Sequence, residues 1–157
     1  MYWLEGRASE GGRNVIVRRA SDGSVSDVTL AAFNVRSRVH EYGGAAYTVD
    51  RGTVYFSNFA DQRLYRQAIG AEPQPMSPAG YFYADCRVDA AHRHLFCVRE
   101  DHTRGDAEPL NTIVAVSLDR GGAGTVLVSG ADFYSDPIVH PTGRSIAWLQ
   151  WRHPNMP

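Results

Sequence analysis

Three tyrosines in this chain of 157 residues each lie within two positions of an acidic residue. The pairs are Glu41 with Tyr42, Tyr83 with Asp85, and Tyr134 with Asp136. A carboxylate beside an aromatic ring can meet a substrate amine or a peptide. With one adjacent histidine included, the candidate contacts to such a ligand are His40, Glu41, Tyr42, Tyr83, Asp85 and Asp136.

The same tyrosines also have a structural interpretation, which we favour. Aromatic rings fill the space between packed sheets, and a buried tyrosine hydroxyl usually finds a hydrogen-bond partner. In that case the rings at positions 42, 83 and 134 would pack between neighbouring sheets and bond to the main chain. Both interpretations require sheets that repeat at the spacing of the tyrosines.

A complete hydrolytic site is not visible in the chain. The nucleophile of an α/β hydrolase lies in a Gly-x-Ser-x-Gly turn, and no serine here has glycine at both of those flanking positions. Serine, histidine and acidic residues all occur, but composition alone does not make a catalytic triad. We therefore expect no catalytic residue in this chain.

Metal and cofactor motifs are also weak. His92 and His94 could place two imidazoles on one face of a strand, but they lie at a predicted hairpin turn and are interpreted as surface histidines. The segment 121–124 lacks the glycine spacing of a dinucleotide-binding loop and is predicted to be a hairpin loop. We expect neither a metal nor a cofactor.

A second set of residues repeats in step with the tyrosines. The tyrosines at 42, 83 and 134 are 41 and 51 residues apart, and the apolar segments that begin at Val54, Leu95 and Ile146 have the same two spacings. Strand-rich repeats of roughly 40–50 residues are typical of β-propellers, whose four-stranded blades pack against one another. The sequence therefore predicts an all-β fold, a partial propeller of four-stranded antiparallel blades.

Two complete blades flanked by two partial ones are predicted. The strands of the complete blades are expected at 45–49, 53–57, 63–66 and 74–77, and at 83–89, 93–99, 111–116 and 125–128. The partial blades are expected at 2–5 and 14–17, and at 138–140 and 145–151. Because a complete propeller has at least four blades, we expect residues 1–157 to be one propeller segment that is truncated at both ends.

The composition is that of an ordinary globular protein, with 43% hydrophobic residues and a net charge of −1. This charge gives no attraction to nucleic acid or to an anionic membrane, and no apolar run is long enough to span a bilayer. No signal peptide is visible, so we expect a cytoplasmic location. All 16 basic residues are arginines, which bind carboxylates well, but their scatter along the chain suggests a compositional bias.

The two cysteines, Cys86 and Cys97, fall on adjacent strands of one predicted hairpin. They could lie near each other, but a disulfide needs matching Cβ geometry that a sequence does not show. Because there is no sign of export, we expect two reduced and partly buried thiols.

Longer stretches of the sequence resemble a known family. The segments 39–44, 54–65 and 98–102 together resemble the prolyl oligopeptidase family of serine peptidases, most closely its bacterial dipeptidyl-aminopeptidase and acylaminoacyl-peptidase-like members. The segments 2–7 and 153–157 also resemble the propeller of that family. The resemblance spans nearly the whole chain.

The resemblance implies an N-terminal β-propeller that covers a C-terminal α/β-hydrolase domain and restricts access to short or unstructured peptides. That hydrolase domain, which carries the catalytic serine, aspartate and histidine, is absent from this chain. We therefore expect a non-catalytic segment that gates and positions peptide substrates for the missing domain, with no nucleic acid or membrane as partner. The alternative is a stand-alone propeller that serves as a protein-interaction module.

Overall fold

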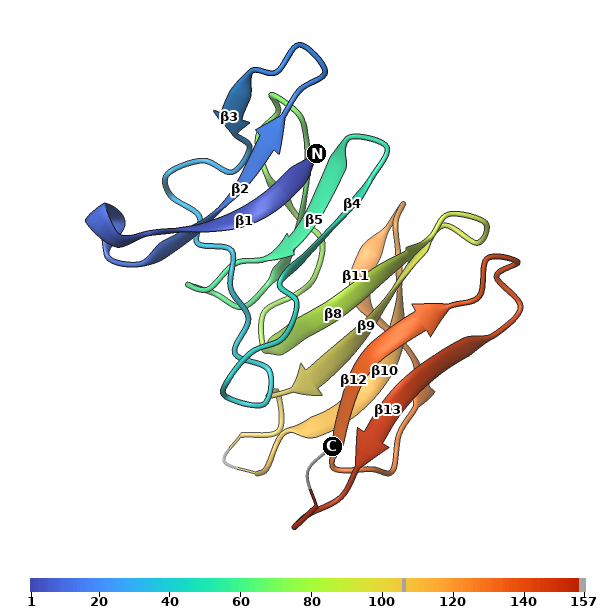
Figure 1. Ribbon diagram of the computed structural model, residues 1–157. Helices are drawn as coiled ribbons and strands as arrows, with labels where there is room; N and C mark the ends of the chain where they lie inside the picture. Colours follow the sequence, from blue (N-terminus) through green and yellow to red (C-terminus); the bar gives the residue numbers. More distant parts are fainter. Residues whose placement is uncertain (106, 156–157) are drawn as a thin grey trace.

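The chain forms four antiparallel sheets that follow one another along the sequence and are called blades 1 to 4 here (Figure 1). The structure is a computed structural model that describes residues 1–105 and 107–155. Blade 1 contains β1 (Tyr2–Arg7), β2 (Arg13–Arg19) and β3 (Val25–Asp27). Blade 2 contains β4 (Tyr47–Asp50), β5 (Thr53–Ser57), β6 (Leu64–Ala68) and β7 (Gln74–Pro75).

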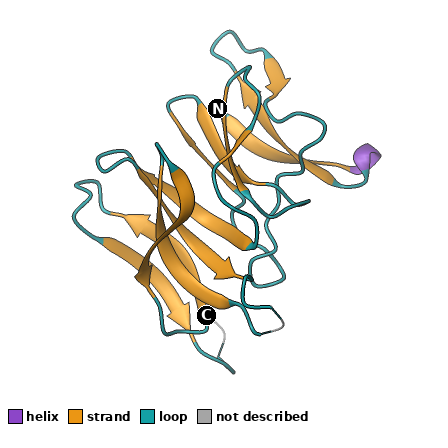
Figure 2. Cartoon of the chain, turned by 180° about the vertical axis from the view of Figure 1, so that it is seen from behind, coloured by secondary structure: helices purple, strands orange, loops and turns teal. Residues whose placement is uncertain are grey.

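The other two blades lie in the second half of the chain. Blade 3 contains β8 (Tyr81–Asp89), β9 (His94–Asp101), β10 (Leu110–Ser117) and β11 (Gly121–Val128). Blade 4 contains β12 (Phe133–Val139) and β13 (Ile146–Trp151). The one helical segment among the described residues is a short 3-10 turn at Ala8–Glu10, which Figure 2 shows at the tip of blade 1. Two four-stranded blades flanked by smaller sheets confirm the predicted fold class.

The apolar core lies between blades, because most strands of the two complete blades bury both of their faces. Val54 and Phe56 on β5 pack toward blade 1, whereas Tyr55 between them packs toward blade 3. On β10, Ile113 packs toward blade 4 and Val114 toward blade 2. Since successive side chains of a strand point to opposite faces, a strand buried on both faces needs a continuous apolar run. Strands buried on both faces therefore explain why apolar runs recur so clearly along the sequence.

The segment predicted as a loop at 121–124 is instead the start of β11, and this correction has a steric reason. A Cβ at Gly121 would lie 2.2 Å from the carbonyl oxygen of Met76 in blade 2. The amide of Gly122 donates a hydrogen bond of 2.7 Å to that same oxygen. Glycine therefore allows the outer strand of blade 3 to pass directly against blade 2.

The expectation of two reduced thiols was wrong, because Cys86 and Cys97 form a disulfide. The ladder between β8 and β9 shifts register between Ala84 and Arg87, and this bulge brings Cys86 opposite Cys97 with a Cα–Cα distance of 4.1 Å. Both cysteines are buried in the apolar cluster between blades 2 and 3.

The same bulge turns the carboxylate of Asp85 toward two other blades. Asp85 has a positive φ of 53° and is only 8% exposed. Its Oδ1 accepts a hydrogen bond of 2.7 Å from the amide of Ala45, which precedes β4, and its Oδ2 accepts one of 3.3 Å from the amide of Asp136 on β12. The amide of Asp85 also donates to the carbonyl of Ala45. One carboxylate thus links blades 2, 3 and 4.

We predict that Asp85→Ala lowers the free energy of unfolding by about 2 kcal/mol more than Asp136→Ala, as measured by urea unfolding. Both aspartates have a positive φ, so the backbone cost of alanine is shared by the two variants. The Asp136 side chain is exposed, whereas loss of the Asp85 carboxylate leaves two amides without an acceptor. Equal destabilisation by the two variants would show that Asp85 does not join the blades.

We also predict that the purified chain, denatured without reductant, shows no thiol that reacts with Ellman's reagent. The double variant Cys86→Ala/Cys97→Ala should lose about 2–4 kcal/mol of unfolding free energy, because the disulfide restricts the unfolded chain. Two reactive thiols in the unreduced protein would contradict the assigned bond.

Candidate functional site

A cleft of about 940 Å³ lies at the end of the blades where β9 ends and β13 ends. Its walls come from the segment before β4, the loop between β9 and β10, and both strands of blade 4. The lining residues include His40, Glu41, Tyr42, Glu100, His102, Leu110, Asn111, Phe133, Trp151 and His153. We call this cavity the loop-end cleft.

The turn before β4 brings three of the predicted contacts into this cleft. Val39 is buried between blades 3 and 4 and anchors the turn there. His40 and Glu41 then adopt positive φ angles of 54° and 66°. The chain closes at Gly43, where a Cβ would lie 2.7 Å from the carbonyl oxygen of Ser37. The tight turn projects His40 and Tyr42 toward blade 4.

Glu100 is the buried acid of the cleft, with only 4% of its surface exposed. Its Oε1 accepts a hydrogen bond of 2.6 Å from the backbone amide of His40, and its Oε2 lies 3.0 Å from Nε2 of His102. The ring of His102 stacks on Phe82 at a centroid distance of 3.9 Å. Glu100 therefore fixes the turn before β4 onto blade 3 and places negative charge in the cleft.

Aromatic rings form the opposite wall. Phe133 and Trp151 face each other across the β12–β13 ladder and stack at 5.5 Å between centroids. His40 packs edge-on against Phe133 at 5.1 Å. Tyr42 lies 5.8 Å from His40 and is 65% exposed, so it stands at the rim of the cleft.

Three buried polar atoms of cleft-lining residues make no hydrogen bond of normal geometry among the described residues. They are Nε2 of His40, Oδ1 of Asn111 and Nε1 of Trp151. Buried polar groups are normally paired, so the indole N–H of Trp151 is left for a ligand, whereas the side chains of His40 and Asn111 also act on each other. Burial lowers the pKa of His40, against the opposing effects of the Glu100 charge, the Asn111 side chain and the Asp85 charge, and this favours a neutral imidazole at neutral pH.

The cleft combines hydrogen-bonding groups with a carboxylate and aromatic rings. Asn111 offers a hydrogen-bond acceptor and the Trp151 indole N–H a donor, which are the groups that pair with a peptide backbone. The Glu100 carboxylate and the aromatic rings favour a positive charge such as an ammonium group. Within the residues that the structure describes, no group of three or more His, Cys, Asp or Glu side chains is placed to hold a metal ion.

The six predicted contacts divide into two groups. His40, Glu41 and Tyr42 line the loop-end cleft. Tyr83 does not, because it is fully buried between blades and its hydroxyl donates to the carbonyl of Ala123 at 3.1 Å. Asp85 and Asp136 lie at the junction of the first strands of blades 3 and 4.

The structural interpretation of the tyrosines holds for two of the three. Burial raises the pKa of Tyr83, so its hydroxyl stays protonated and donates to the main chain. The hydroxyl of Tyr134, also fully buried, accepts a hydrogen bond from the amide of Ala131. Tyr42 departs from the pattern, because it lies in the turn before β4 and not at the start of a strand.

Sequence reasoning missed four residues of the cleft, which are Glu100, Asn111, Phe133 and Trp151. Glu100 lies near the end of β9, where the polar stretch that leads to β10 begins, so that stretch was the available signal. Phe133 and Trp151 are 18 positions apart in the sequence, and only the β12–β13 register brings them together.

Neither a protein-family model nor a curated protein matches this chain. Among the described residues, no helix has the length and hydropathy of a membrane span. Solved structures do match. A puromycin-hydrolyzing peptidase of Mycobacterium tuberculosis is 36% identical, with a TM-score of 0.87 over 99% of this chain and 26% of that one.

Two further solved structures agree with this match. Puromycin hydrolase is 32% identical, with a TM-score of 0.86, and a mutant of it complexed with PGG is 32% identical, with a TM-score of 0.87. Each match covers 99% of this chain but only 27% of the other. The chain therefore has, over nearly its whole length, the sequence and fold of a propeller segment of the prolyl oligopeptidase family, as found in these puromycin-hydrolysing peptidases.

Proposed function

We propose that this chain is a non-catalytic part of a serine peptidase, which gates and positions short peptides for an α/β-hydrolase domain that lies outside the 157 residues. The observation that carries the proposal is the loop-end cleft, where a buried carboxylate, aromatic rings and the unpaired indole N–H of Trp151 meet. The likeness to puromycin-hydrolysing peptidases supports it, because those chains are about four times as long as the part that this chain matches.

In such an enzyme the bond cleavage would be acyl transfer from the peptide to a serine of the hydrolase domain. This chain would contribute binding energy, which helps only when it holds the scissile bond in the reactive geometry. Asn111 and Trp151 would pair with the peptide backbone, and His40 would add a neutral hydrogen-bonding group. The packed blades around the cleft would admit only short or unfolded peptides.

Glu100 has the central role in this proposal. It would attract the free ammonium group of a peptide, while the neighbouring rings of Phe133 and Trp151 exclude water from that contact. The Glu41 side chain is 85% exposed, and Tyr42 stands at the rim of the cleft. These two residues would attract a peptide as it approaches the cleft but would not contact it once it is bound. Tyr83 and Asp85 would act indirectly, by holding the blades that carry the cleft, and Asp136 would take part through its backbone amide alone.

The gene tests the first part of the proposal. We predict that the reading frame continues downstream of position 157 and reaches a Gly-x-Ser-x-Gly motif. A stop codon immediately after position 157 in the native gene would instead favour a stand-alone interaction module.

The second test uses the full-length enzyme with the variant Glu100→Gln. Glutamine keeps an acceptor for the His40 amide but removes the charge, so kcat/KM for short peptides with a free amine should fall about 10-fold to 100-fold. N-acetylated versions of the same peptides should change less than about 3-fold, because they carry no ammonium group.

The variant Glu41→Ala is the matched comparison in the same assay. Because its carboxylate is exposed, kcat/KM should fall only about 2-fold to 3-fold, and the loss should shrink at high salt. An equal loss on free and acetylated peptides in Glu100→Gln would overturn the assignment of Glu100 to the substrate amine.

A further inference from the structure

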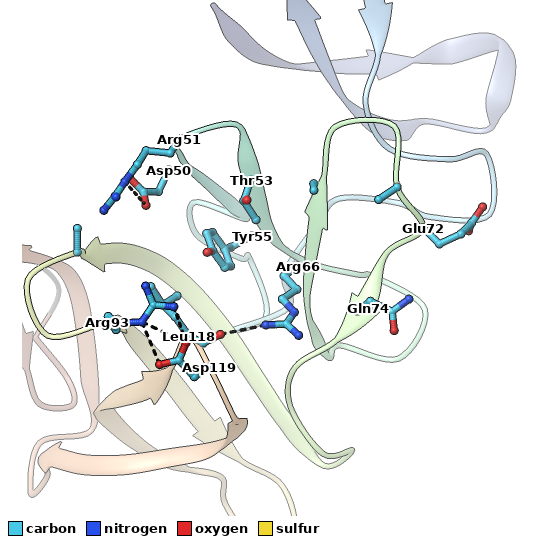
Figure 3. Close-up of a pocket in the computed structure, with 13 residues that line it drawn as sticks. Asp50, Arg51, Thr53, Tyr55, Arg66, Glu72, Gln74, Arg93, Leu118 and Asp119 are labelled. Atoms are coloured by element: carbon cyan, nitrogen blue, oxygen red, sulfur yellow. Dashed lines mark hydrogen bonds and ion pairs between the residues drawn. The ribbon is translucent and has the colours of Figure 1, made fainter.

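A second cleft, of about 480 Å³, lies at the opposite ends of the same strands, between blades 2 and 3 (Figure 3). Arg93, which precedes β9, lines this cleft, whereas Glu100 near the end of β9 lines the loop-end cleft. We propose that this arginine cleft binds a small oxyanion, a carboxylate or a phosphate. The proposal does not depend on the peptidase function.

Three guanidinium groups reach the arginine cleft from three separate segments. Arg51 comes from the β4–β5 turn, Arg66 from β6, and Arg93 from the β8–β9 turn. The turn arginines both have positive φ, 43° at Arg51 and 55° at Arg93. Figure 3 shows all three side chains around the space beside Tyr55. Arginine in such a cluster is the side chain best suited to bidentate binding of an oxyanion.

Tyr55 supplies a hydroxyl in the midst of these arginines. Its side chain lines the cleft, yet the residue is only 7% exposed because its ring packs into the core between blades 2 and 3. Burial and the nearby Asp50 carboxylate raise the pKa of Tyr55, and the charges of Arg66, Arg93 and Arg51 oppose that rise. The hydroxyl therefore remains an O–H donor at neutral pH.

The lining carries three arginines and three acidic residues, but not every arginine is paired with an acid. Arg51 pairs with Asp50, and Arg93 pairs with Asp119. Arg66 has no carboxylate partner among the described residues, and its NH1 donates to the carbonyl of Leu118 at 3.1 Å.

The positive charge of Arg66 is therefore left for a ligand. Glu72, the remaining acid of the lining, points away from the space between Tyr55 and Arg66 in Figure 3.

These groups define the ligand by its chemistry. An oxyanion beside Tyr55 would accept one hydrogen bond from the phenol and two from the free edge of the Arg66 guanidinium. Arg93 lines the same cleft, where it is already paired with Asp119. Since the cleft is open to solvent, we expect a Kd on the order of 0.1–1 mM at low ionic strength.

The test is isothermal titration calorimetry of the 157-residue chain with inorganic phosphate and, separately, with succinate, at constant ionic strength. Binding of phosphate but not succinate would assign a phosphate-bearing ligand to the cleft. Binding of succinate but not phosphate would assign a carboxylate, and binding of both would assign oxyanions in general. Binding of neither anion overturns the proposal.

Three variants locate the site. Arg66→Gln should weaken binding at least about 10-fold, and Tyr55→Phe, which keeps the packed ring, about 3-fold. Arg144→Gln removes the same charge from the exposed turn between β12 and β13 and should change the Kd less than about 2-fold. Binding that survives both cleft substitutions, or that falls equally with Arg144→Gln, would also overturn the assignment.

Discussion

The buried carboxylate of Asp85 is the contact on which the arrangement of the blades depends. It accepts hydrogen bonds from the segment before β4 and from β12 while it sits on β8, so it fixes the first strands of three blades in one geometry. A buried carboxylate is stable only when its oxygens are paired, and here both are. Sheets held in this way place their loops at one end and their tight turns at the other, and each end forms a cleft.

The two clefts differ because the connections that build them differ. At the loop end, the turn that contains His40 is anchored by Val39 in the core and by Glu100 through its backbone amide. That end carries negative charge and aromatic surface. At the turn end, short hairpin turns carry arginines, and Tyr55 extends from the core beneath them. The packed sheets are the same at both ends of the strands, whereas the loops at one end and the hairpin turns at the other carry different residues. The two ends therefore present chemically distinct surfaces.

The repeat of the blades could be read from the sequence because strands buried on both faces require unbroken apolar runs, as at Val54–Phe56. The disulfide could not, since it depends on a bulge beside Ala84 that shifts the β8–β9 register. The turn at residues 40–42 was predicted as a ligand contact because of its acidic and aromatic residues. Trp151 and Asn111 were not, because they reach the cleft only through pairings between distant segments.

We propose above that the loop-end cleft binds a short peptide. The indole N–H of Trp151 reports on this directly, because it has no partner within the described chain, whereas those of Trp3 and Trp148 bond to Glu5 and Gln150. Titration with a free-amine tripeptide should shift the Trp151 indole signal in a ¹H–¹⁵N NMR spectrum and leave the Trp3 signal unchanged. A Trp151 signal that does not move at saturating peptide would contradict the account.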